Sequence, residues 1–146
     1  NGSAIRTSGV RQLDQALLAA SFAARVPRNS PEISRFVEVL HHCQAVRRFG
    51  SAALNVCYVA AGRLDGYWAT SAKIWDVAAG VLCIWEAGGT VTGINGQPFR
   101  LERPHLAAAA TDALHRDLHQ LLSRFPDPAV QEVQEEPGTE YTEGSG

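Results

Sequence analysis

The feature that most constrains how this chain folds is the alternation of short apolar runs with helical segments along residues 13–124. Short apolar runs are typical of strands, whereas apolar residues spaced three and four apart indicate amphipathic helices. The expected strands lie at 13–22, 45–49, 65–68, 90–94, 97–101 and 106–110. The expected helices lie at 31–43, 51–61, 75–87 and 112–124. This order predicts an α/β fold in which layers of helices alternate with a sheet.

Residues at the segment ends support these boundaries. Ser30 is a suitable N-cap, Pro31 suits a first helical turn, and Thr111 is a suitable cap for the last helix. The dipeptide Asn95–Gly96 is the strongest hairpin signal in the chain. The periodicity of 13–22 fits a helix as well as a strand, and we favour a buried strand there.

The segment 75–87 is apolar on almost every side, which predicts a helix at the centre of the fold. Gly88 and Gly89 follow it as a helix stop, since no phosphate-loop pattern accompanies them. The cysteines, which lack metal-ligand spacing, and the tryptophans are expected to pack in the core. They are Cys43, Cys57, Cys83, Trp68, Trp75 and Trp85. Trp68 has the alternative of lining a substrate pocket.

Composition excludes several classes of protein. The chain has 146 residues, of which 45% are hydrophobic and 19% charged, as in one globular domain. No apolar run reaches the roughly 18 residues of a membrane span, and no signal segment opens the chain. We therefore expect a cytoplasmic protein with no membrane partner. The absence of Met predicts that the chain is a trimmed or cut-down piece.

The uneven distribution of charged residues predicts that the chain has two parts. Residues 1–125 carry a net charge of about +4, whereas residues 126–146 carry six acidic residues and no Lys or Arg. We expect residues 1–125 to fold and residues 126–146 to form an acidic, disordered tail. Twelve of the 13 basic residues are Arg, which suits contacts to oxyanions, although GC-rich codon usage accounts for it equally well. No basic run with interleaved aromatics occurs, so no nucleic-acid partner is expected.

Two expected helix starts are candidate ligand sites, because free backbone N–H groups and the positive helix end favour anions. One start is formed by Gly50, Ser51 and Ala52, directly after two arginines. Small residues let a ligand approach the backbone closely, but helix packing explains them equally well. The other start contains Asp76, and a carboxylate in a first turn is commonly only a stabilising end charge.

Several strings together resemble one known family. WDVAAG at 75–80, followed by EAGG at 86–89, resembles the C-terminal signature of the inositol monophosphatase family of magnesium-dependent sugar phosphatases. RRFGSAALNVCYVAAGRLDGYW at 47–68 resembles the preceding segment of bacterial members. NGSAIRTS at 1–8 and VTGINGQPF at 91–99 fit the same order and spacing, so the resemblance covers about residues 1–125.

The resemblance implies the C-terminal half of that layered α/β fold. It also implies a reaction in which Mg²⁺ held by carboxylates activates a water, which attacks a sugar or polyol phosphate monoester in line. Asp76 matches the metal-binding Asp of the family's Trp-Asp pair. Gly50, Ser51 and Ala52 match the segment that contacts substrate hydroxyls, largely through its backbone. A homodimer is the assembly that the family suggests.

One departure from the family pattern concerns the substrate. Members that bind inositol phosphate carry a Glu seven residues before the metal-binding Asp76, where it accepts hydrogen bonds from substrate hydroxyls. Ala69 takes that place here, and a methyl group cannot accept a hydrogen bond. We therefore expect a different substrate, or a substitute role for Thr70, Ser71 or Lys73.

A second departure concerns the metal. The family's other metal carboxylates come from an Asp-Pro-Ile-Asp-Gly-Thr-type motif and an earlier Glu, and the chain contains neither. One carboxylate does not hold a Mg²⁺ that prefers near-octahedral oxygen coordination. We therefore expect the chain alone to be inactive, without a catalytic residue of its own. The alternative is a non-catalytic relic or interaction module that keeps only this half of the fold.

Two other groups of residues are candidate sites with simpler alternatives. His115 and His119, with Asp112 nearby, have a spacing that suits a metal, although a polar helix face is the simpler interpretation. Asp65 follows Arg63 closely, and a turn or a local ion pair is a simpler role for it than catalysis.

Overall fold

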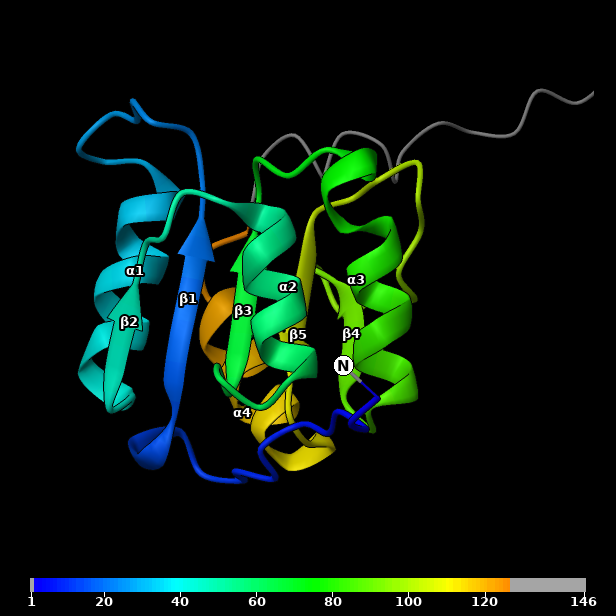
Figure 1. Cartoon of the computed structure of the whole chain (residues 1–146). Helices are drawn as coiled ribbons and strands as arrows, with labels where there is room; N and C mark the ends of the chain where they lie inside the picture. The colour runs from blue at the N-terminus through cyan, green and yellow to red at the C-terminus, as the bar shows by residue number, and fades with distance from the viewer. Residues whose placement is uncertain (1, 127–146) are drawn as a thin grey trace, which may run out of the picture.

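The computed structural model describes residues 2–126, which form a five-stranded mixed sheet in the order β2-β1-β3-β5-β4 (Figure 1). Strands β1 and β2 are parallel, as are β1 and β3, whereas β5 runs antiparallel to both β3 and β4. The strands are β1 Leu17–Ser21, β2 Ala45–Arg47, β3 Gly66–Ala69, β4 Thr90–Gly93 and β5 Leu106–Ala109. The carboxyl ends of β1, β2 and β3 therefore meet at one edge of the sheet.

Helices cover both faces of this sheet. Helices α2 and α3 lie on one face, in front in Figure 1, and α1 and α4 lie on the other. The helices are α1 Pro31–His42, α2 Ala52–Ala60, α3 Ile74–Glu86 and α4 Asp112–Ser123, and a short 3₁₀ helix, η1, covers Leu13–Gln15. The result is a three-layered α/β fold, as expected from the sequence.

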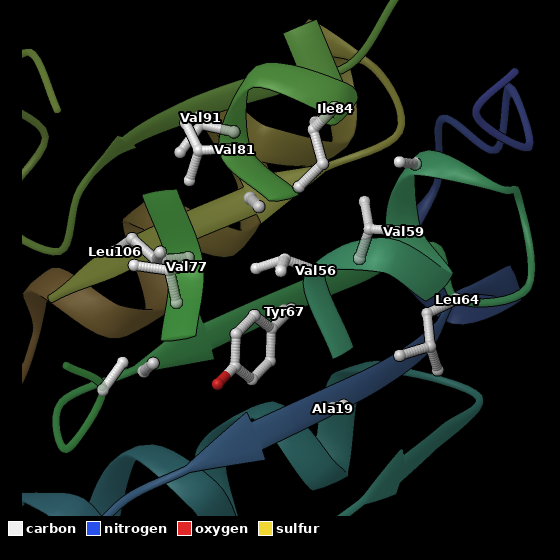
Figure 2. Close-up of a cluster of buried hydrophobic side chains, with 14 of the residues drawn as sticks. Ala19, Val56, Val59, Leu64, Tyr67, Val77, Val81, Ile84, Val91 and Leu106 are labelled. Carbon is white, nitrogen blue, oxygen red and sulfur yellow. The ribbon is translucent and has the colours of Figure 1, made fainter. Parts of the chain in front are cut away.

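The sheet separates two apolar cores, because successive strand residues point to opposite faces. On β3, Tyr67 and Ala69 face α2 and α3, whereas Trp68 faces α1 and α4. Figure 2 shows the first core, in which Val56 of α2 and Val77 of α3 lie around Tyr67.

The expected helix caps are confirmed. The hydroxyl of Ser30 accepts a hydrogen bond from Glu32 N at 3.2 Å, and that of Thr111 accepts one from Leu114 N at 3.2 Å. Gly88 ends α3 with a φ of 94°, a left-handed conformation that favours glycine.

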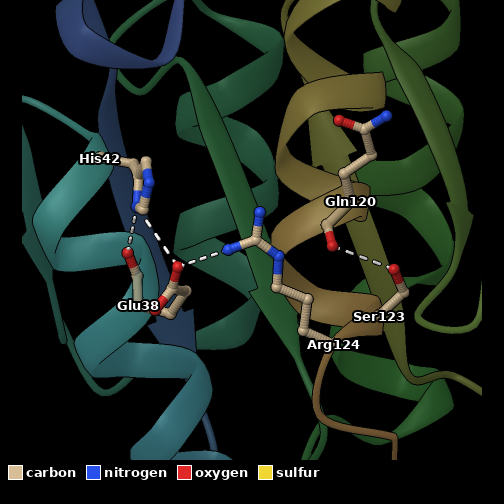
Figure 3. A network of polar contacts seen from close by, with 5 residues as sticks. All are labelled: Glu38, His42, Gln120, Ser123 and Arg124. Carbon is tan, nitrogen blue, oxygen red and sulfur yellow. Dashed lines mark hydrogen bonds and ion pairs between the residues drawn. The ribbon is translucent and has the colours of Figure 1, made fainter.

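Helices α1 and α4 are joined by an ion pair (Figure 3). Arg124 Nη1 donates to Glu38 Oε1 at 2.6 Å, and His42 Nδ1 lies 3.7 Å from the same oxygen. The side chains of Arg124 and His42 are well exposed, so solvent screens the charges and the contact contributes at most about 1 kcal/mol.

Some expected strands are shorter than the sequence suggests, and one does not form. The run 13–22 begins as η1 and becomes strand β1 only at Leu17, and the run 45–49 is a strand only over Ala45–Arg47. The expected strand 97–101 is absent from the described residues, where this segment has only two isolated bridges, Thr92 with Pro98 and Arg100 with Arg103. Proline has no N–H to donate, so the pairing after the Asn95–Gly96 turn does not continue as a ladder.

Helix α3 is not central, and this expectation was wrong. Its buried residues lie along one face, at Val77, Gly80, Val81 and Ile84. The opposite face is exposed: Trp75 is 78% exposed, Leu82 56% and Trp85 47%. The helix contacts the rest of the described structure along one side only. Its apolar composition therefore did not predict which of its residues are buried.

The expectation that the cysteines and tryptophans pack in the core was wrong for Cys57, Cys83, Trp75 and Trp85, whereas Cys43 packs against the second core. Cys57 on α2 and Cys83 on α3 are exposed, and Cys43 is half-buried. Trp75 and Trp85 are exposed, whereas Trp68 is fully buried. Residue type predicted their burial poorly because they fall on outward faces of their helices.

The expected acidic tail lies outside the described residues, except for Pro126. The boundary near residue 125 therefore stays a prediction. Among the helices of residues 2–126, none has the length and hydropathy required to span a bilayer.

Helices α2 and α3 approach each other closely at Gly80. A Cβ placed on Gly80 would lie 2.8 Å from Val56 Cβ and closer still to Val56 Cγ2. Such a distance is too short for two carbon atoms, so a larger residue must push the helices apart.

We expect Gly80→Ala to lower the free energy of unfolding by about 1–3 kcal/mol through overpacking. Urea unfolding of Gly80→Ala, Val56→Ala and the double variant measures this. The double variant should be more stable than the sum of the single effects, because Val56→Ala removes the clashing methyl groups. Ala79→Ser, on the exposed side of the same helix, serves as control and should change stability by about 0.5 kcal/mol or less. Additive effects in the double variant would contradict the prediction.

Candidate functional site

A cleft of about 390 Å³ opens at the carboxyl ends of the parallel strands. It is lined by the end of β1, the β2–α2 connection, the β3–α3 connection and the first turn of α3. The lining residues are Ala20, Ser21, Phe22, Arg48, Gly50, Ala52, Ser71, Ala72 and Asp76. Ligands of open α/β sheets bind at this edge, where connections leave neighbouring strands in different directions.

The cleft brings together the two helix starts that the sequence singled out. Gly50 and Ala52 lie at the start of α2 and Asp76 lies in the first turn of α3, and all three line the cleft. The helices converge because α2 packs directly on α3 on the same face of the sheet. Ala52 and Asp76, which are 24 positions apart in the sequence, thus share one site.

Ser51 has a different position from its neighbours. Its hydroxyl accepts a hydrogen bond from Leu54 N at 3.2 Å and so caps α2. The residue is not among those lining the cleft. Gly50, just before it, has a φ of 80°, which an L-residue with a side chain rarely adopts. The glycine and the capped serine together fix how α2 starts.

Asp76 is the carboxylate of the cleft. Its Oδ2 accepts a hydrogen bond from Lys73 N at 3.1 Å, the only hydrogen bond to this carboxylate among residues 2–126. The side chain is half-buried, so the rest of the carboxylate is available to a ligand in the cleft. The bond to Lys73 N also fits the simpler role considered in the sequence analysis, a stabilising charge at a helix start.

Arg48 is a cleft residue that sequence reasoning did not single out as a site. Its guanidinium lies 3.8 Å from the centre of the Phe22 ring, and Nη2 donates to Phe22 O at 2.8 Å. These contacts hold a positive group at the mouth of the cleft. Its place directly after β2 was the available signal, since strand ends at this edge line ligand sites.

The sequence pointed to only one of the two serines that line the cleft, Ser21 and Ser71. Ser21 is the last residue of β1 and lines the cleft, and the sequence did not point to it. Ser71 also lines the cleft, whereas the alternatives Thr70 and Lys73 are not among the lining residues. Ala69 is fully buried in the core below, so its methyl group belongs to packing.

A polar layer lies beneath the cleft. Tyr67 and Asn55 are both fully buried, and burial raises the pKa of the Tyr67 phenol above its ordinary value of 10.0. Ser21 and Asn55 lower that pKa as polar neighbours of the phenol, and the negative charge of Asp76 raises it. Even so, the Tyr67 hydroxyl oxygen and both amide atoms of Asn55 form no hydrogen bond of normal geometry.

The other candidate groups have structural roles. The rings of His115 and His119 stack with centroids 6.2 Å apart, and His115 Nε2 lies 2.9 Å from Thr92 Oγ1. Within residues 2–126, no three His, Cys, Asp or Glu side chains are placed to hold a metal ion. The two oxygens of Asp65 accept hydrogen bonds from the Ser8 hydroxyl at 2.5 Å and from Leu17 N at 2.7 Å, so Asp65 ties the N-terminal segment to β1.

Comparison with known proteins connects this chain to one family. The model of the inositol monophosphatase family matches residues 1–126. The chain is 41% identical over 111 residues to the Nus factor SuhB of Pasteurella multocida. It is 38% identical over 127 residues to an inositol-1-monophosphatase of Synechocystis. These alignments cover 75% and 86% of this chain but only 42% and 44% of the two relatives. The chain thus spans less than half the length of these relatives.

Solved structures show the same fold. An inositol monophosphatase from Anabaena (Nostoc) has a TM-score of 0.75 and 36% identity, over 86% of this chain and 50% of that one. The extragenic suppressor protein SuhB from Bartonella henselae has a TM-score of 0.78 and 33% identity, over 85% of this chain and 47% of that one. The layered fold expected from the resemblance is confirmed.

The pKa of His115 makes stability depend on pH. Burial lowers this pKa below its ordinary value of 6.5, His119 lowers it further, and Asp112 opposes the shift. The unfolded chain therefore takes up the proton first as the pH falls. The contribution of His115 to the free energy of unfolding is therefore fully present above pH 6.5 and is lost as the pH falls through 6.5 toward the pKa of the folded state.

We expect His115→Gln to weaken this loss of stability, because the variant has no imidazole to titrate. Urea unfolding measured above and below pH 6.5 tests it. The exposed His41, changed to Gln in the same way, is the matched control and should keep the wild-type dependence. An unchanged pH dependence in His115→Gln would show that other groups cause it.

Proposed function

This chain belongs to the inositol monophosphatase family, and from that premise we propose that the protein containing it hydrolyses a sugar or polyol phosphate monoester with the aid of Mg²⁺. The observation that carries the proposal is the convergence of Asp76 and the start of α2 on one cleft. A carboxylate suits a hard cation, and a helix start suits a phosphate.

The cleft residues fit a shared Mg²⁺ site. Asp76 supplies one carboxylate whose only hydrogen bond within the described chain is to Lys73 N, which leaves oxygen lone pairs for a cation. We propose that Asp76 is one ligand and that further carboxylates come from the part of the relatives that this chain does not span. When bound, Mg²⁺ neutralises phosphate oxygens and lowers the pKa of a nucleophilic water.

The remaining cleft residues would bind the substrate. The free backbone N–H groups at Gly50 and Ala52, together with the Arg48 guanidinium, offer hydrogen-bond donors for phosphate oxygens and hydroxyls. Ser51 contributes by capping α2 and fixing the direction of those groups. Ser21 and Ser71 add hydroxyls that can both donate and accept.

The side chain at position 69 affects which phosphate ester the cleft prefers. The buried methyl group of Ala69 offers no acceptor for a substrate hydroxyl. We propose that Ser71, at the rim of the cleft, takes over part of that role, and that the preferred phosphate ester differs from inositol phosphate. A hydroxyl is a weaker and less directional acceptor than a carboxylate, so selectivity among polyols should be low.

A second function is a non-catalytic role in an assembly. Ala69 in place of the expected carboxylate favours it, as does the likeness to relatives named Nus factor SuhB. The two proposals differ in one respect: a binding module has no need of the Asp76 carboxylate.

We expect Asp76→Asn in the intact gene product to reduce Mg²⁺-dependent phosphate release by about 100-fold or more, because an amide is a neutral and weaker Mg²⁺ ligand. The measurement is phosphate release from inositol phosphate, fructose bisphosphate and adenosine bisphosphate. Asp112→Asn is the matched control, because Asp112 occupies the first turn of α4 and lies outside the cleft. No release by the wild type from any of the three would favour the non-catalytic function.

We expect Arg48→Gln to raise KM for the phosphate ester by about tenfold, with a smaller change in kcat. The reason is that the guanidinium would contact the phosphate in both the ground state and the transition state. Steady-state kinetics at saturating Mg²⁺ measures both constants. Arg63→Gln, in the exposed turn that follows α2 and outside the residues lining the cleft, is the control. A KM equal to that of the wild type would remove Arg48 from substrate binding.

A further inference from the structure

Two buried polar side chains lie directly beneath the cleft, and the proposed function does not use them. Asn55 of α2 and Tyr67 of β3 are each 0% exposed. The Tyr67 hydroxyl and the Oδ1 and Nδ2 atoms of Asn55 form no hydrogen bond of normal geometry, although Ser21 and Asn55 lie close enough to the phenol to lower its pKa. They belong to the layer between the sheet and the pair α2 and α3, where most other residues are apolar.

The Tyr67 hydroxyl lies on the side of the core that faces the cleft residues. In Figure 2 the Tyr67 hydroxyl points along the sheet toward the carboxyl end of β1. Its polar neighbours are Ser21, Asn55 and Asp76, and two of these, Ser21 and Asp76, line the cleft. Polar groups from β1, α2, β3 and α3 therefore converge on one place.

The hydrogen-bond donors and acceptors among these atoms indicate which kind of ligand they bind. A buried polar atom without a partner is costly, so three of them are expected to gain partners in the folded protein. A direct bond between Tyr67 and Asn55 would satisfy one amide atom of Asn55 and leave the other. A cation fits poorly, because Asn55 Nδ2 is a donor. A water molecule both donates and accepts, and buried waters typically make about three hydrogen bonds.

We propose that Ser21, Asn55 and Tyr67 bind one internal water beneath the cleft, and that this water positions the Asp76 carboxylate. The described chain holds that carboxylate by a single hydrogen bond, from Lys73 N. A second bond, from the water, would fix the direction in which the free oxygen faces the cleft. The water site stands on the buried atoms alone, whereas its positioning role rests on the metal-binding role of Asp76 in the proposed function.

Tyr67→Phe removes the phenol oxygen and keeps the ring. Trp68→Phe is the matched control: it changes the next aromatic residue of β3 and removes a buried N–H that also lacks a partner, but on the opposite face of the sheet. Ser21→Ala, at the half-exposed end of β1, tests the same water without disturbing the core. All are made in the intact gene product.

The first readout is Mn²⁺ binding, measured by calorimetry. We expect Tyr67→Phe to weaken Mn²⁺ binding by about tenfold, as loss of an outer-shell partner does, and Ser21→Ala to act in the same direction. Trp68→Phe should bind Mn²⁺ like the wild type even where it lowers the melting temperature. Wild-type Mn²⁺ affinity in both Tyr67→Phe and Ser21→Ala would overturn the positioning role.

A high-resolution crystal structure of the wild type is the second readout. We expect one water within hydrogen-bond distance of Tyr67 and Asn55, and its loss in Tyr67→Phe. A structure in which these side chains bond only to each other or to protein atoms would overturn the water site. If Asp76→Asn binds Mn²⁺ as tightly as the wild type, the metal role of the proposed function fails, and the crystal structure still decides the water site by itself.

Discussion

The close packing of α2 against α3 is the contact on which the cleft depends. Both helices start at the carboxyl edge of the sheet, and the absence of a side chain at Gly80 lets the backbone of α3 approach Val56. Because helices are stiff, a short distance at this contact also limits the distance between the two helix starts. The apolar core in Figure 2 thus determines where Asp76 lies relative to Gly50 and Ala52.

The same arrangement gives the cleft its electrostatic character. Two helix starts and the Arg48 guanidinium direct positive potential into it, while Asp76 is the only acidic residue among the lining residues. Such a surface attracts an oxyanion more readily than a bare cation. A cation and a phosphate bound together would neutralise each other there, which is the combination proposed above for this cleft.

Most of the fold could be predicted from the sequence, because its segments carry strong local signals. Ser30 and Thr111 cap their helices as expected, and the alternation of segments gave the right fold class. Burial was less predictable, since an apolar helix such as α3 exposes whatever the rest of the fold does not cover, including Trp75. The end of strand pairing at Pro98 was readable in principle, because proline cannot donate to a ladder.

The site was predicted less completely than the fold. Local patterns singled out Asp76 and residues 50–52 as helix starts but left their roles open, and the roles proposed for them come from a resemblance. Ser21, Asn55 and Tyr67 gave no signal, because their significance arises from three segments meeting in space. Hydrogen-bonding capacity that is buried and unused is visible only after side chains are placed.

The outward face of α3 has a practical consequence for handling this polypeptide in isolation. Trp75, Leu82 and Trp85 present indole and isobutyl groups to water along one helix. Exposed apolar surface of this kind promotes self-association and the binding of hydrophobic dyes. Preparations of this polypeptide by itself will need low concentration or mild detergent to stay dispersed, and light scattering should accompany every biophysical assay performed on them.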